Sequence, residues 1–280
     1  MSHRKFGVKK MSNTGEILTK FPVRYTKEEK KTFREWLIAF AQKEGLPVTE
    51  IGDKHYTNVV VGSVDAPILI SAHYDTAARS FLSIQTEIGG SVFRKTRRLF
   101  REAWASILQS SKPNPNNYND NTSGVSALVK LFPAVKKNPQ VALAFFDGEE
   151  DGSRGAKLLK KNQPLLGKNL VINLDCIGFG QTIGVLYYKS AMKGVANHLA
   201  QALQSEPFDA FTGKIGFTFA TDAQIFQNAI NLATFQKGKR VYYFPNIHTP
   251  KDKVLQEENL LYITDRLANF LKNTEIDVKP

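Results

Sequence analysis

The stretch QVALAFFDGEEDGSRGAKLLKKN, residues 140–162, joins a short apolar run to a helical pattern through a turn. Residues 140–148 are almost continuously apolar up to Asp-Gly, which is typical of a strand buried on both faces of a sheet. Asp-Gly marks a turn, and residues 153–162 are predicted to form a short helix. A buried strand followed closely by a helix is the repeating unit of α/β proteins.

The same alternation continues on both sides of this stretch. Further strands are predicted where β-branched residues lie between turn formers, at residues 55–63, 66–76, 169–179 and 241–244. Helices are predicted from apolar residues at helical spacing, at residues 27–45, 122–135, 191–206 and 257–273. Alternating strands and helices predict an α/β fold with a mostly parallel sheet that is covered on both faces.

Composition narrows the class of protein. The chain has 280 residues, of which 42% are hydrophobic and 23% charged, so we expect a globular domain spanning residues 1–280. No apolar run approaches the roughly 20 residues of a membrane span, and no signal-peptide segment follows the basic N-terminus, so we expect a cytoplasmic location. The single cysteine, Cys176, is expected to be buried. The net charge of +12 favours anionic surfaces, but charge alone does not make nucleic acid an expected partner.

A long insertion at residues 80–117 interrupts the alternation. Within it, residues 93–110 place apolar side chains roughly on one helical face and arginines and lysines on the other. A basic amphipathic helix of this kind suits docking on the core. It also suits a lid over the ligand crevice, a contact in a homo-oligomer, or a membrane surface.

Polar residues follow three of the predicted strands. His73 and Asp75 end the first, Glu149 and Glu150 end the second, and Asp175 ends the third. In open α/β sheets, ligands bind in the crevice beyond the carboxyl ends of the strands. The sequence therefore predicts a chemically active site at this edge of the sheet.

Two further groups come from other segments. Asp120 precedes the helix predicted at residues 122–135, and His248 follows the aromatic strand at 241–244. Taken singly, each residue has an ordinary explanation: Asp120 could cap the helix, and Asp147 could be a turn former. The joint pattern is harder to explain in this way. Five groups from five segments form a set of metal ligands without cysteine: His73, Asp120, Glu150, Asp175 and His248.

Mixed imidazole and carboxylate ligands suit zinc, manganese or cobalt better than magnesium or calcium. A catalytic zinc takes three protein ligands and a water, so five residues can serve two ions if one carboxylate is shared. Asp120 would be the shared carboxylate, and it would bind one ion together with His73 and Asp175. Glu150 and His248 would complete the other.

The charge of such a centre favours a bound hydroxide. Three carboxylates leave one positive charge on two divalent ions, and metals lower the pKa of bound water from 15.7 to about 7. Glu149, next to Glu150 but facing the other way, is then predicted to take the proton of the water as general base.

Five motifs in the same order resemble the M28 family of zinc metallopeptidases, which includes aminopeptidases with a co-catalytic metal pair. They are ISAHYDT, NDNTSGVSAL, FFDGEEDGSRGA, INLDCIG and IHTPKDK, which together extend from about residue 68 to residue 253. The resemblance implies the same ligand set and base, and it places Asp75 behind His73 as its orienting carboxylate. It also implies a three-layer αβα sandwich around a mixed, mostly parallel sheet of about eight strands. The implied reaction is the removal of N-terminal residues from peptides.

The chain also departs from the family pattern. The stretch FATDAQIF resembles the family's Ser-Asp-His segment, but Ala223 stands where histidine is common. Asp222 is therefore only a candidate substrate-binding residue. The long insertion at residues 80–117 also separates this chain from compact members of the family.

Two alternatives remain open at this point. Glutaminyl cyclases of the same family use nearly the same ligands with a single zinc, although a Trp-containing insertion typically follows their DGEE, whereas DGSRGA follows at once here. A non-catalytic scaffold domain is the other alternative. The intact ligand set and base disfavour it.

Overall fold

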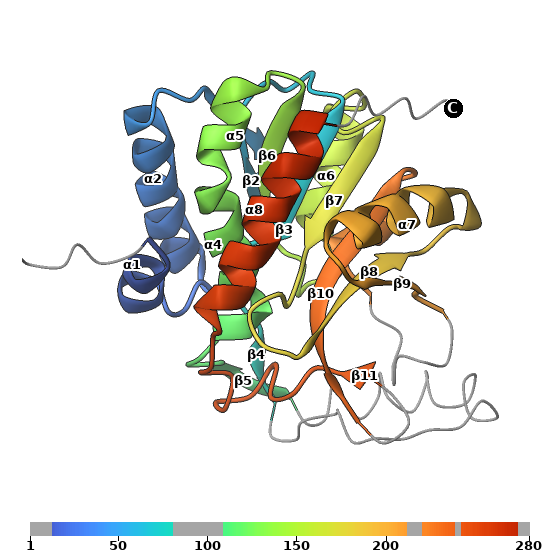
Figure 1. Ribbon diagram of the computed structural model, residues 1–280. Helices are drawn as coiled ribbons and strands as arrows, with labels where there is room; N and C mark the ends of the chain where they lie inside the picture. The colour runs from blue at the N-terminus through green and yellow to red at the C-terminus, as the bar shows by residue number, and fades with distance from the viewer. Residues whose placement is uncertain (1–12, 81–108, 212–219, 239–241, 274–280) are drawn as a thin grey trace, which may run out of the picture.

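A computed structural model describes residues 13–80, 109–211, 220–238 and 242–273 (Figure 1). The insertion predicted at residues 80–117 lies largely outside these ranges, and the basic helix predicted at 93–110 almost entirely so. The role of that helix therefore stays a prediction.

A mixed sheet of nine strands forms the middle layer of the described structure. Its order is β1-β2-β6-β3-β7-β10-β8-β9, with β11 paired to β10. The central strands β6, β3, β7 and β10 run parallel, while β2 and β8 are antiparallel to their central neighbours. The strands are β1 (Val48–Gly52), β2 (Thr57–Val61), β3 (Ile68–His73), β6 (Val141–Phe146), β7 (Leu170–Leu174), β8 (Thr182–Tyr187), β9 (Glu206–Asp209), β10 (Ala229–Lys237) and β11 (Tyr242–Tyr243). A separate pair joins β4 (Ala78–Ser80) to β5 (Gln109–Pro113).

Helices cover both faces of the sheet. They are α1 (Asn13–Lys20), α2 (Lys27–Lys43), α4 (Ser123–Lys130), α5 (Phe132–Lys137), α6 (Arg154–Asn162), α7 (Lys193–Ala202) and α8 (Glu257–Asn273). Figure 1 shows α4 and α8 in front of the sheet and α6 behind it. Short helical turns are η2 (Tyr118–Thr122), η3 (Ser190–Met192) and η4 (Asp222–Ile225).

Alternation along the strands produces the two sides of the core. In β6, Leu143 and Phe145 pack into the core cluster shared with α2, α4 and α8, whereas Ala144 and Phe146 pack into the cluster shared with α6. Successive strand residues point to opposite faces, so a strand covered on both faces must be apolar throughout. All six residues of β6 are buried, as its continuous apolar run predicts.

The predicted α/β fold and three-layer sandwich are confirmed, with nine strands in place of about eight. The prediction of a single helix at residues 122–135 is wrong in one respect, because this segment forms two helices, α4 and α5, that meet at Leu131. Pro133 lies in the first turn of α5, where its missing N–H is tolerated, whereas inside one continuous helix its ring would clash with the preceding turn. Strands β1, β4, β5, β8, β9 and β10 and helix α1 were not predicted.

Candidate metal centre

Three parallel strands bring three polar chain segments to one edge of the sheet. In the register, His73 at the end of β3 lies opposite Phe146 at the end of β6, and Ser71 lies opposite Asn173 of β7. Asp175 therefore follows β7 at the level of His73, and the turn that carries Glu149 and Glu150 begins just beyond β6. This shared edge is the expected consequence of parallel pairing.

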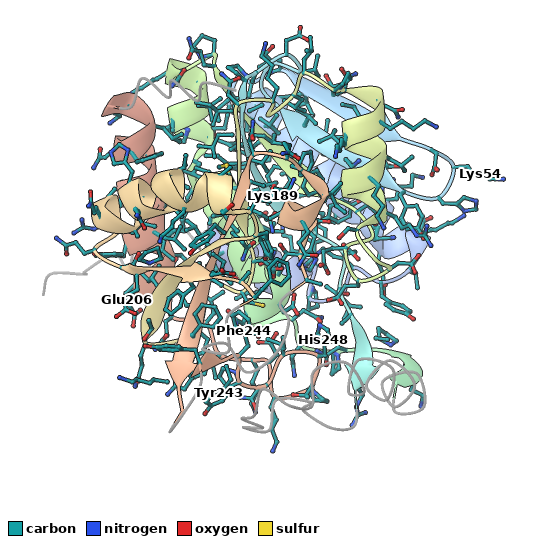
Figure 2. The ribbon with its side chains drawn as sticks, turned by 90° about the vertical axis from the view of Figure 1, so that its right-hand side faces the viewer. Lys54, Lys189, Glu206, Tyr243, Phe244 and His248 are labelled. Atoms are coloured by element: carbon teal, nitrogen blue, oxygen red, sulfur yellow. The ribbon has the colours of Figure 1, made fainter. Side chains whose placement is uncertain are left out.

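Asp120 lies between the two histidines. Its Oδ1 is 3.1 Å from Nε2 of His73, and its Oδ2 is 2.9 Å from Nε2 of His248. Asp120 belongs to η2 and is followed by a cis peptide bond to Asn121. His248 lies in the loop after β11, and Figure 2 shows it in the lower half of the molecule, on the same level as Phe244 and away from Lys54.

The remaining two predicted ligands approach one histidine each. Oδ1 of Asp175 lies 3.6 Å from Nε2 of His73, and Oε2 of Glu150 lies 3.4 Å from Nε2 of His248. The structure thus brings all five predicted ligand side chains into one cluster, with Asp120 at its centre. Within this cluster, Asp175 lies next to His73 and Glu150 lies next to His248.

Asp75 connects the end of β3 to the turn that carries the glutamates. Its carboxylate accepts hydrogen bonds from the backbone N–H groups of Glu149 and Glu150, both at 3.1 Å. Nδ1 of His73 lies 3.1 Å from the backbone oxygen of Asp75 and 3.5 Å from its Oδ1. Asp75 is therefore placed both to orient the imidazole and to fix the two glutamates.

The two histidines are held in a strongly acidic environment. Burial lowers the pKa of His73, but contacts with carboxylates, Asp120 and Asp175 among them, raise it well above its usual value. At His248, burial has the same effect, and Glu150 and Asp120 raise the pKa well above its usual value. This excess of negative charge shows that the cluster is built to hold positive charge.

The carboxyl groups differ in the direction in which their surroundings shift their pKa. Burial raises the pKa of Glu149 well above its usual value, and it also raises those of Glu150 and Asp175. At Asp120, burial is outweighed by the hydrogen-bonding histidines, so its pKa is lowered. Asp120 is thus the carboxylate that stays ionised most readily, and Glu149 is the one that takes up a proton most readily.

The donor set fits divalent metal ions. One ligand atom each from His73, Asp120 and Glu150 lie within 4.8 Å of one another, and the same holds for Asp120, Asp175 and Cys176. Oε1 of Glu150 is buried and has no hydrogen-bond partner among the described residues. A buried carboxylate oxygen without a donor requires a cation or a proton, and imidazole and carboxylate donors together suit zinc.

Asp222 lies at the start of η4 and is fully buried. Neither of its carboxylate oxygens has a hydrogen-bond partner among the residues that the structure describes. Burial raises its pKa to about 7, opposed by His73 and by the Ser153 hydroxyl, which does not reach hydrogen-bond geometry. A cavity of about 180 Å³ is lined in part by the next residue, Ala223, and by Tyr188.

Three functional contacts were not predicted from the sequence. Asp252 accepts hydrogen bonds from the backbone N–H groups of Asn119 (2.9 Å) and Asp120 (3.1 Å), so it ties the two ligand-bearing loops together. Its position four residues after His248 is the only sequence signal for this role. Asp147 is more than a turn residue because it forms a buried ion pair with Lys30 at 2.7 Å. Arg24, whose contacts are described below, gave no signal at all.

Residues 57–270 match the sequence profile described as Peptidase family M28. The chain belongs to peptidase family M28. The family identified from the five motifs is thereby confirmed, and membership of it supports a metallopeptidase as the general class. M28 membership implies a divalent metal, typically zinc, which agrees with the donor set described above. No curated protein matches the sequence of the chain.

Solved structures similar to this chain include both aminopeptidases and glutaminyl cyclases. A glutaminyl cyclase of Bacteroides thetaiotaomicron bound to N-acetylhistamine aligns with a TM-score of 0.67 and 15% identity, over 93% of this chain and 95% of the other. A leucine aminopeptidase precursor of the same species aligns with a TM-score of 0.65 and 16% identity, over 93% of this chain and 94% of the other. The Legionella pneumophila aminopeptidase LapA aligns with a TM-score of 0.62 and 17% identity, over 93% of this chain and 68% of the other. At such identities the likeness shows the shared fold.

Among the described residues, no helix has the length and apolar character needed to cross a bilayer.

Proposed function

We propose that this protein is a metallo-aminopeptidase that removes N-terminal residues from peptides with two divalent ions, most suitably zinc. The observation that carries the proposal is the position of Asp120, whose two carboxylate oxygens lie 3.1 Å and 2.9 Å from two different histidines. A carboxylate that serves two imidazoles from its two oxygens has the geometry of a bridging ligand.

The other ligands follow from their neighbours. His73 and Asp175 would hold one ion together with Asp120, and Glu150 and His248 would hold the other. When bound, such ions polarise the scissile carbonyl group and lower the pKa of a water from 15.7 to about 7.

Glu149 is the general base in this proposal. Burial raises the pKa of its carboxyl group well above the usual value, so this carboxylate has a raised affinity for a proton, as a general base requires. Glu149 would take the proton of the attacking water and later give it to the leaving amine. Asp75 would keep the glutamate in place through the backbone N–H bond at 3.1 Å.

Asp222 would bind the free α-amino group of the substrate. Its two buried oxygens have no donor among the described residues, so an ammonium group would satisfy them. This requirement for a free amine would restrict cleavage to the N-terminal residue. The cavity of about 180 Å³ lined by Ala223 and Tyr188 is below the roughly 300 Å³ of typical ligand pockets, so it suits one side chain rather than an extended peptide.

The test uses a panel of aminoacyl chromogenic substrates with the zinc, cobalt and manganese forms of the protein. Release of the chromophore from unblocked but not from N-acetylated substrates is the expected result. A glutaminyl peptide tests the cyclase alternative in the same experiment: ammonia release without peptide cleavage would replace the present proposal by a cyclase. A protein that retains no metal and has no activity after reconstitution would indicate a scaffold.

A further inference from the structure

Arg24 is the largest fully buried side chain of the described residues, and it lies next to the metal centre. Its guanidinium group donates three hydrogen bonds: Nε to the backbone oxygen of Tyr74, Nη1 to that of Phe21 at 2.6 Å, and Nη2 to Oγ1 of Thr122 at 3.0 Å. All three acceptors are uncharged. A buried charge normally requires a partner of opposite sign, so the position of the nearest carboxylates matters.

Those carboxylates belong to the candidate metal centre. Burial lowers the pKa of Arg24 to about 10, and the negative charges of Asp75 and Asp120 oppose this fall, so the guanidinium stays charged at neutral pH. No carboxylate of the described residues forms an ion pair with it. The acidic centre as a whole is therefore its counter-charge.

The hydrogen bonds join two of the chain segments from which the site is built. Tyr74 lies between His73 and Asp75, and Thr122 lies two residues after Asp120. One planar group thus holds the end of β3 and the loop of η2 at a fixed separation. The backbone adds two more bonds, from Arg24 N to Oγ1 of Thr76 (3.1 Å) and from Thr76 N to the oxygen of Arg24 (3.2 Å).

We propose that Arg24 is a positioning residue of the metal centre, supplied by an N-terminal segment that precedes the family-matched residues 57–270. It sets the distance between the segments that carry His73 and Asp120. The inference rests on the proposed two-metal function. In that state Arg24 is a further positive charge beside the acidic groups of the centre, Asp75 and Asp120 among them.

A purely structural role for Arg24 leads to different expectations. If it only fastened the N-terminal segment to the core, its loss would lower stability equally with and without metal. If it acted only through its charge, its removal would strengthen zinc binding, because a nearby positive charge repels the ion. Positioning predicts weaker zinc binding, since partners that orient metal ligands typically contribute 10- to 100-fold in affinity.

The experiment compares three variants with the wild-type protein. Arg24→Met removes the charge and all three side-chain donors, Arg24→Lys keeps the charge but loses the planar fork, and Thr122→Val removes only the acceptor on the Asp120 side. Leu199→Ala, in the buried face of α7, is the control for a general loss of stability. The measurements are the zinc dissociation constant by chelator competition, the visible absorption of the Co²⁺ form, and the melting temperature with and without zinc.

We expect Arg24→Met and Arg24→Lys each to weaken zinc binding by about tenfold or more and to change the Co²⁺ spectrum. Thr122→Val should have a smaller effect, and combining it with Arg24→Met should add little, because both remove the same bond. Leu199→Ala should melt at a lower temperature but leave zinc affinity and the spectrum unchanged. If Arg24→Met does not fold, Arg24→Lys and Thr122→Val decide the question.

Wild-type zinc affinity in these variants, or tighter binding in Arg24→Met, would overturn the inference. These readouts do not depend on turnover. If the wild-type protein cleaves no aminoacyl substrate but its Arg24 variants lose zinc, the proposed function is contradicted and the positioning role of Arg24 is supported. An active wild-type protein whose Arg24 variants bind zinc normally would do the reverse.

Discussion

Replacing Lys30 by methionine tests whether the N-terminal helix α2 holds the turn that carries the two adjacent glutamates. Nζ of Lys30 lies 2.7 Å from Oδ1 of Asp147, and the two side chains are only 11% and 1% exposed. Removing one partner of a buried ion pair typically costs 3–5 kcal/mol, because the other charge stays buried without compensation. Methionine retains most of the apolar stem of the lysine, so the effect is chiefly one of charge.

Two features place the expected loss at the lower end of that range. The backbone N–H of Thr57 still donates to Oδ2 of Asp147 at 3.1 Å. Burial already raises the pKa of Asp147, so without Lys30 the acid can take up a proton and escape part of the penalty. We therefore expect about 3 kcal/mol of lost stability. At about 2–4 °C per kcal/mol for a chain of this size, the melting temperature should fall by roughly 6–12 °C.

The assay is thermal and urea unfolding followed by circular dichroism. Lys31→Met is the matched control, because Lys31 is the next residue of the same helix but is 56% exposed and lies 3.8 Å from Glu35. An exposed pair of this kind contributes about 0.3–0.5 kcal/mol, so its loss should barely move the transition. Adding Asp147→Asn to Lys30→Met should restore much of the stability. A double variant no more stable than Lys30→Met would refute the argument from charge.

Three further predictions concern the centre and its support. Glu149→Gln should keep both metals and the fold but lower turnover by about 10²- to 10⁴-fold, checked by metal analysis together with steady-state kinetics. His248→Ala should lose one metal in preference to the other on dialysis against a chelator, and equal loss of both would contradict the two-ion assignment. Gly155→Ala should lose about 1–3 kcal/mol in urea unfolding, because the new Cβ would lie 2.2 Å from the backbone oxygen of Asp147. Gly194→Ala, whose Cβ meets nothing within 4 Å, should be neutral or stabilising in the same measurement.

The sequence predicts the parts of this protein that depend on local pattern and topology. Residues at the ends of β3, β6 and β7 share one edge because parallel strands align their carboxyl ends. That rule is enough to bring His73, Asp175 and the two glutamates together before any coordinate is known. It also explains why Asp120 and His248, which lie in loops, needed their chemistry as well as their position to be recognised.

Other features depend on distant contacts that no local pattern encodes. Lys30 lies among charged residues near the start of an amphipathic helix, like the exposed Lys31, and only its partner Asp147, 117 residues away, makes it a buried cation. The role of Arg24 also depends on a distant contact, because its acceptor Thr122 is 98 residues away in the sequence. Strand β10 (Ala229–Lys237) is buried as β6 is, but Asn231 and Thr234 interrupt its apolar run and no clear turn and helix follow it, so the alternating pattern did not reveal it.

The adjacent glutamates Glu149 and Glu150 can have separate tasks because their backbone is fixed from one side. The carboxylate of Asp75 accepts both of their N–H groups at 3.1 Å, so the two consecutive peptide groups face the same acceptor and cannot rotate independently. Glu150 then reaches His248 at 3.4 Å, while the charges nearest to Glu149 include those of His73 and Asp222. If this clamp were lost, either glutamate could approach a metal ion. The proposed division between ligand and base would then depend on the side-chain χ angles alone, and a χ angle about 30° away from its rotamer costs only about 0.5–1.5 kcal/mol.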